Sequence, residues 1–85
     1  MRLISTHKTD NYSYINMPYE STVLILREEY IWNNEAGEGW AIHGIMNGEY
    51  SELAAYKTKE RAEQVLKELH SHYITGGPSF VFPDK

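Results

Sequence analysis

The chain has 85 residues, no cysteine and a formal net charge of −4. Its length fits one domain over residues 1–85, near the size at which a single core is marginal, so we expect a homo-oligomer that buries more apolar surface. The composition excludes disulfides and thiolate metal sites, and the interleaved charges argue against DNA or RNA binding, which needs a basic stripe. No apolar run approaches the roughly 20 residues of a membrane span and no signal-peptide pattern is present, so we expect a cytoplasmic protein.

The first part of the chain predicts short strands separated by polar turns. The predicted strands, which are rich in β-branched, aromatic and apolar residues, are residues 2–5, 12–17, 22–27 and 30–32. The apolar run within residues 22–27 is typical of a strand that is covered on both faces. Because Glu28 and Glu29 follow this run, we predict a charged turn at that point.

A loop and a hairpin are predicted next. Residues 33–39 are rich in Asn, Glu and Gly, and we expect the flanking residues Trp32 and Trp40 to face each other as a cross-strand pair. Strands are predicted at residues 40–46 and 49–56. Asn47-Gly48 between them is a strong hairpin signal, since both central residues of a type I′ turn need positive φ.

One amphipathic helix is predicted over residues 58–75, with Thr58 as its N-cap and Gly76 at its end. Its apolar positions recur with helical period and are Ala62, Val65, Leu66, Leu69 and Tyr73. A short strand is predicted at residues 80–82. Together these elements predict an α+β fold, an antiparallel β-sheet of about five or six short strands with one amphipathic helix packed on it and a short C-terminal strand.

The histidines do not predict a metal site. His70 and His72 are two positions apart on the predicted helix, so their side chains point about 200° apart and cannot share an ion. His7 and His43 lie in separate predicted elements, and no carboxylate follows either at metal-ligand spacing. We therefore expect no metal, and we expect His43 to be a packed or partly exposed strand residue.

Catalysis is not predicted either, and no cofactor is expected. The carboxylates near predicted strands are not paired by their spacing, and no serine lies in a nucleophile elbow. Binding remains. Lys59 and Arg61 lie in the first helical turn, where free N–H groups point outward, which favours either an anion site or a solvated helix end. The abundant aromatic residues have two interpretations as well, packing in a sheet or an aromatic ligand cage.

Four segments, taken in order, resemble a family of small proteins from Firmicutes phages. The segments are Met1-Arg2-Leu3-Ile4-Ser5, Ile15-Asn16-Met17-Pro18-Tyr19-Glu20, Tyr56-Lys57-Thr58-Lys59-Glu60-Arg61-Ala62 and Phe80-Val81-Phe82-Pro83. The best understood branch of this family is similar to the phage Thoeris anti-defence proteins of the first type. Those proteins are signal sponges, which sequester the cyclic ADP-ribose signal made by a host TIR protein and do not cleave it.

The resemblance implies a phage protein that acts in the infected bacterial host and binds a small anionic nucleotide signal. It implies a pocket where subunits meet, in which aromatic rings stack on the base and Arg or Lys pairs with the pyrophosphate. The residues implied in ligand binding are Lys59, Arg61, Phe80, Phe82 and Trp40. Phe80 and Phe82 point to the same face of a strand, so the alternative for both is packing under the helix.

A competing interpretation is a protein–protein inhibitor. A small acidic protein with exposed aromatic side chains could cap a host or CRISPR defence protein, and its Glu-rich loops would steer it toward a basic partner surface. The two hypotheses differ in the chemical class of the partner, a nucleotide in one and a protein in the other.

Overall fold

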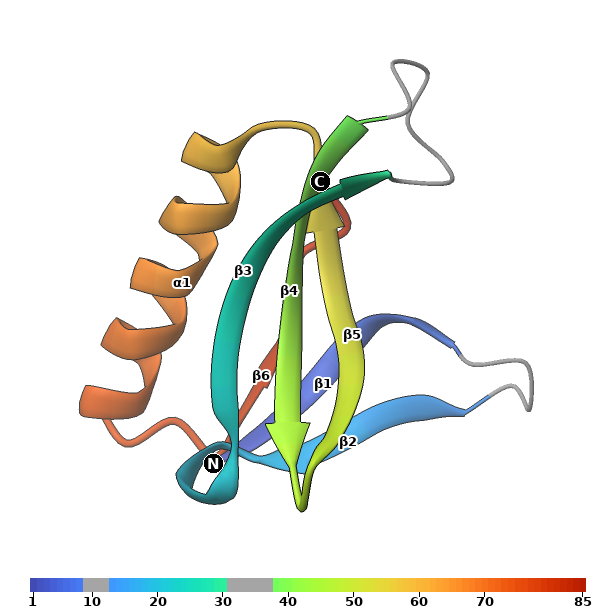
Figure 1. Cartoon of the computed structure of the whole chain (residues 1–85). Helices are drawn as coiled ribbons and strands as arrows, with labels where there is room; N and C mark the ends of the chain where they lie inside the picture. The colour runs from blue at the N-terminus through green and yellow to red at the C-terminus, as the bar shows by residue number, and fades with distance from the viewer. Residues whose placement is uncertain (9–12, 31–37) are drawn as a thin grey trace.

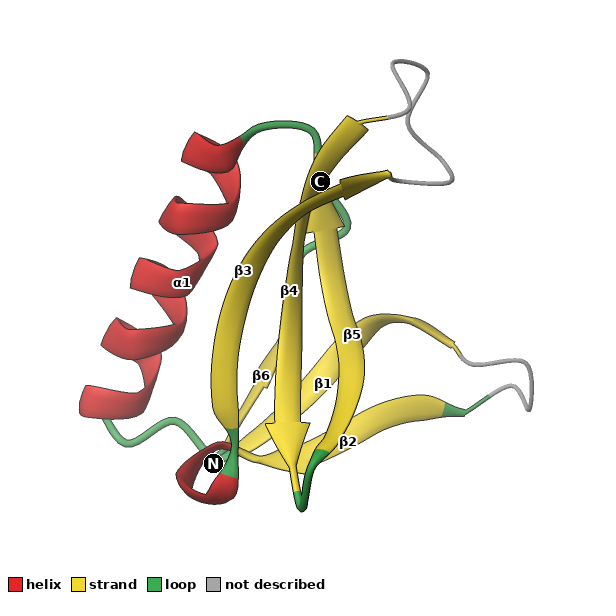
Figure 2. Ribbon diagram, viewed as in Figure 1, coloured by secondary structure: helices red, strands yellow, loops and turns green. Residues whose placement is uncertain are grey.

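A computed structural model of the chain describes residues 1–8, 13–30 and 38–85 (Figure 1). The elements in chain order are β1 (Arg2–Lys8), β2 (Tyr14–Pro18), the 3-10 helix η1 (Tyr19–Ser21), β3 (Val23–Tyr30), β4 (Glu38–Met46), β5 (Glu49–Tyr56), α1 (Lys59–Ile74) and β6 (Ser79–Val81). The predicted α+β class is confirmed, with one long helix beside the strands (Figure 2).

The strands form two three-stranded sheets, in the orders β2-β1-β6 and β3-β4-β5, whereas we expected a single antiparallel sheet. The division occurs at Pro18, which has no N–H to continue a ladder, and at η1, which turns the chain toward β3. β6 pairs with β1 in parallel. A parallel pair needs a long crossover, and here the chain between β1 and β6 includes the whole β3-β4-β5 sheet and α1.

The β3-β4-β5 sheet corrects three sequence predictions. Glu28 and Glu29 do not form a turn, because they lie in β3 and pair with Trp40 and Gly39 of β4. Glu38 and Gly39 lie in β4 and not in the predicted loop, whose other residues are outside the described part of the chain. β3 is not covered on both faces, because the Val23 side chain is 62% exposed. The expected partner of Trp40, Trp32, lies outside the described residues.

Local turn and cap predictions are confirmed. The Thr58 side chain accepts a hydrogen bond from the Arg61 N–H at 3.1 Å, so it caps α1 as expected. Asn47 and Gly48 both have positive φ, 53° and 80°, which is the type I′ geometry of a two-residue hairpin. Gly76 has φ of 82° and ends the helix in the left-handed region.

The core lies where α1 and the two sheets meet. Its buried residues come from β1, β2, β4, β5, α1 and the segment after β6, and are Leu3, Met17, Ile42, Leu53, Ala54, Tyr56, Ala62, Val65, Leu69 and Phe82. β3 adds the partly buried Leu24 and Leu26, which pack against this core. Phe82 lies just after β6, and its main-chain N–H donates to the Ile4 carbonyl at 3.1 Å. The segment that follows α1 therefore returns into the core rather than along the surface.

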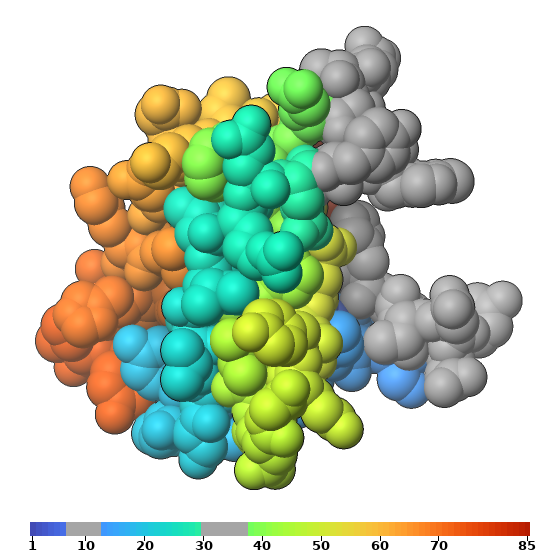
Figure 3. Space-filling model, viewed as in Figure 1, coloured from blue at the N-terminus to red at the C-terminus, as the bar shows by residue number. Residues whose placement is uncertain are grey.

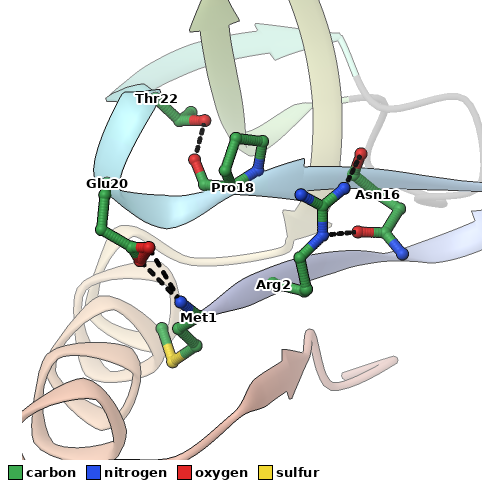
Figure 4. Close-up of polar contacts among 6 residues, drawn as sticks. All are labelled: Met1, Arg2, Asn16, Pro18, Glu20 and Thr22. Carbon is green, nitrogen blue, oxygen red and sulfur yellow. Dashed lines mark hydrogen bonds and ion pairs between the residues drawn. The ribbon is translucent and has the colours of Figure 1, made fainter.

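Two polar contacts join the start of the chain to the β2 region (Figure 4). The Met1 amino group donates to both carboxylate oxygens of Glu20, at 2.6 and 2.9 Å, and these hydrogen bonds hold the pKa of Glu20 below its usual range. The Arg2 Nε donates to the Asn16 Oδ1 at 2.6 Å. Thr22 closes the η1 turn by donating to the Pro18 carbonyl at 2.6 Å.

None of the helices in the described part of the chain has the length and the apolar character that crossing a bilayer requires. The expected cytoplasmic location stays a prediction.

Candidate functional site

Two of the residues expected to bind a ligand meet at the start of α1. Lys59 is the first residue of the helix, and its Nζ lies 5.3 Å from the centroid of the Trp40 ring on β4. Trp40 is partly buried, and Lys59 is exposed. A cation over an indole face is attracted by the negative face of the ring, so this contact holds Lys59 close to an aromatic surface. We call Trp40, Lys59 and Arg61 the helix-start surface.

Arg61 completes this surface but already has partners within the chain. Its Nε and Nη2 donate to the main-chain oxygen of Lys85 at 3.1 and 2.7 Å. Its Nη1 lies 3.7 Å from a carboxylate oxygen of Glu68, and its guanidinium carbon lies 5.8 Å from the centroid of the Tyr56 ring. A ligand at this guanidinium would therefore compete with the Lys85 carbonyl.

The two phenylalanines do not join the helix-start surface. Phe82 is 2% exposed and belongs to the core, so its ring offers no face to a ligand. Phe80 packs edge-on against Phe82, with ring centroids 5.3 Å apart, and against His72, at 5.7 Å. His72 is thirteen residues along α1 from Lys59, which is roughly 20 Å of helix. Both rings therefore make packing contacts, Phe82 in the core and Phe80 with His72 of α1.

Tyr56 lies beneath the helix-start surface and ties it to the end of the described chain. Its hydroxyl donates to the Pro83 carbonyl at 2.8 Å. Burial is the main cause that raises the pKa of Tyr56 to about 12. The phenol is therefore neutral at physiological pH and serves as a hydrogen-bond donor.

A second polar group lies on the outer face of the β3-β4-β5 sheet, and sequence reasoning missed it. His43 of β4 contacts Glu29 of β3, with Nε2 at 3.3 and 3.2 Å from the two carboxylate oxygens. Glu52 of β5 pairs with His43 in register. One ligand atom from each of these three residues lies within 4.8 Å of the other two, so they form a group that can hold a metal ion.

Two of the three residues in this group could have been found from the sequence. A two-residue turn at Asn47-Gly48 places Met46 opposite Glu49, and counting back along both strands brings His43 opposite Glu52. Glu29 could not be assigned to the group, because a turn was wrongly predicted at Glu28 and Glu29.

An open depression lies along the exposed side of α1. This open depression is lined by Gln64, Lys67, Glu68, Ser71, His72 and Thr75. Its lining mixes both charges and includes none of the residues expected to bind a ligand.

Comparison of the chain with protein-family models, with curated proteins and with solved structures found no match. The contacts described above are therefore the basis on which a function can be argued.

Proposed function

We propose that this protein binds and sequesters a small anionic nucleotide-type immune signal, of the cyclic ADP-ribose class, without cleaving it. The observation that carries the proposal is the position of the Lys59 ammonium, 5.3 Å from the Trp40 ring centroid at the start of α1. This surface combines an aromatic face, two cationic side chains and the N–H end of a helix dipole. A nucleotide presents the complementary groups, a flat base and a pyrophosphate. The resemblance to signal sponges supports the same ligand class.

In this proposal each residue of the helix-start surface has one role. Trp40 stacks on the base, which contributes about 1–3 kcal/mol. Lys59 turns from the indole face to the pyrophosphate, and Arg61 exchanges the Lys85 carbonyl for a charge-assisted bond to the same group. These three residues attract an anion and include no carboxylate or imidazole that could activate a water molecule, which is why we propose sequestration and not hydrolysis. The proposal also includes a second subunit of a homo-oligomer, which would cover the exposed Lys59 and close the pocket.

The test is thermal unfolding of the purified protein against cyclic ADP-ribose isomers and cyclic di- and trinucleotides. A ligand at 100 times its Kd adds about 2.7 kcal/mol, which raises the midpoint of a domain of this size by about 10–20 °C. Mass spectrometry of the ligand released by heat should then find it intact.

Two variants test whether the ligand binds at the helix-start surface. Lys59→Ala and Arg61→Ala should each weaken binding about tenfold or more, because each removes a charge-assisted contact. Lys67→Ala is the matched control, since it removes the same charge from the exposed side of α1, two turns farther along. No shift with any compound would contradict the ligand class. Equal losses in all three variants would contradict the site.

A protein-directed inhibitor is the second candidate, and one observation favours it. Tyr50 of β5 is 60% exposed and Val23 of β3 is 62% exposed. Both residues pair with Ile45 of β4, so their side chains share one face of the sheet. Atoms of β3 and β5 lie at the surface in Figure 3. Exposed apolar and aromatic side chains near the exposed Glu52, which is two residues from Tyr50 on β5, fit a partner that has both apolar and basic groups. A protein from infected-host lysate that binds the wild type and Lys59→Ala, but not Tyr50→Ser, would support this candidate.

A further inference from the structure

We propose that Glu29, His43 and Glu52 form a binding site for a divalent transition-metal ion, with Zn²⁺ as the ion that fits best. The three residues come from β3, β4 and β5, so one ion would join all three strands of this sheet. This inference does not depend on the proposed function, because the helix-start surface contributes no residue to it.

The distances fit a tetrahedral ion. Zinc bonds to His nitrogen and carboxylate oxygen are about 2.0–2.2 Å long, which places neighbouring ligand atoms about 3.3–3.6 Å apart. The His43 Nε2 lies 3.2 and 3.3 Å from the Glu29 carboxylate oxygens, close to that spacing without adjustment. The third ligand atom, on Glu52, is within 4.8 Å of the others. Glu52 is the exposed member of the group, so its carboxylate is the ligand that would move toward the ion.

The His43 imidazole is partly buried and faces the Glu29 carboxylate through its Nε2 atom. The His43 side chain is only 13% exposed and that of Glu29 is 27% exposed, so the pair is partly withdrawn from water. Among the residues that the structure describes, the buried Nδ1 of His43 has no hydrogen-bond partner. The polar contacts of the ring that are described here are therefore made through Nε2, the atom that faces Glu29.

The donor set selects the class of ion. Two carboxylates and one neutral imidazole offer two negative charges and a borderline nitrogen, which suits Zn²⁺, Co²⁺ or Mn²⁺. Ca²⁺ and Mg²⁺ prefer oxygen ligands throughout. Three protein ligands also leave the fourth tetrahedral position for a water molecule or for a donor atom of a partner.

The test uses the full chain without a polyhistidine tag. Isothermal titration with Zn²⁺ should give one ion per chain, and Co²⁺ should give the intense visible absorption of a tetrahedral site. Zn²⁺ should also raise the midpoint of thermal unfolding, since it binds the folded sheet and joins three strands.

Two variants and one control decide the assignment. Glu52→Gln should weaken Zn²⁺ binding by more than about tenfold, since loss of even an outer partner of a metal ligand costs about that much. His43→Gln should abolish it, and if this partly buried change prevents folding, the exposed Glu52 still provides the test. His70→Gln is the matched control, because His70 is exposed on α1. Absence of Zn²⁺ binding in the wild type, or an equal loss in His70→Gln, would overturn the proposal.

Discussion

At the residue scale, burial decides which aromatic side chains serve the fold. Tyr56 and Phe82 are both buried, and both lie where the end of the described chain meets the sheets. Trp40, by contrast, is partly buried under Lys59 and keeps an aromatic surface near solvent. Three aromatic residues therefore have three different roles. Tyr56 is a buried hydrogen-bond donor, Phe82 is a core residue and Trp40 is a candidate stacking platform.

The pKa of Tyr56 leads to a prediction for alkaline pH. Because the folded state raises this pKa from 10 to about 12, the neutral phenol stabilises the fold fully below pH 10, and that stability is lost as the pH rises through about 12. A spectroscopic titration of the tyrosines should show a late component that disappears in Tyr56→Phe. The same variant should lower the free energy of unfolding by about 0.5–1.5 kcal/mol at neutral pH, because it removes the hydroxyl that donates to the Pro83 carbonyl.

Tyr50→Phe is the control for this titration, because the Tyr50 side chain is 60% exposed. If the late component disappeared in Tyr50→Phe and remained in Tyr56→Phe, the assignment to Tyr56 would be wrong. Denaturant unfolding at neutral pH measures the cost of each variant.

At the element scale, the four segments from which we inferred a resemblance to phage proteins build the frame of the molecule. β1 pairs with β2 on one side and with β6 on the other, so the first, second and fourth segments lie together. The third contains the end of β5 and the cap of α1. The side chains of these segments therefore have structural roles in addition to any role in binding, as the Met1 and Glu20 contact illustrates.

The cap of α1 can be tested by itself. Thr58→Ala should destabilise the protein by about 0.5–2 kcal/mol, because the Arg61 N–H loses its acceptor at the helix start. Thr58→Ser keeps the hydroxyl oxygen and should cost much less. Urea unfolding of the three proteins makes the comparison, and an equal loss in both variants would show that the threonine acts through its methyl group instead.

At the scale of the whole molecule, the residues after α1 connect the two sheets and the helix. Phe82 lies in the core with residues from α1 and from both sheets. The Thr6 hydroxyl donates to the Pro83 carbonyl at 3.2 Å, which anchors the same segment to β1. The end of the described chain therefore acts as a central packing element, although it is short and follows a loop.

Truncation of Phe82 tests this role against ligand binding. Phe82→Ala should cost about 3–5 kcal/mol of unfolding free energy, because it leaves a cavity in the core. Val81→Ala is the neighbouring control, since Val81 is 60% exposed, and it should change stability by no more than about 0.5 kcal/mol. Denaturant unfolding measures both, and a Phe82 variant as stable as the wild type would contradict the core assignment.

The sequence predicted elements well where the determining interactions are local. The cap at Thr58, the hairpin at Asn47-Gly48 and the helix end at Gly76 each depend on a few adjacent residues, and all three are confirmed. Glu28 and Glu29 were misplaced because a charged pair is typical of a turn, but here cross-strand pairing with β4 holds them in a strand. The register shift between β4 and β5 was equally hidden. Ile42 and His43 pair with Ala54 and Glu52, so Leu53 is an extra residue in β5, and such a bulge breaks the alternation on which strand faces are predicted.

The same distinction between local and long-range interactions applies to the residues of the candidate sites. The sequence by itself determined that Lys59 and Arg61 lie in the first turn of a helix, because helical period and capping are local properties. Only the tertiary structure decided that Trp40 meets Lys59, that Phe82 enters the core, that β6 joins β1, and that Glu29 reaches His43. These contacts join residues far apart in the chain, and they depend on how two sheets and a helix share one core, which no local pattern encodes.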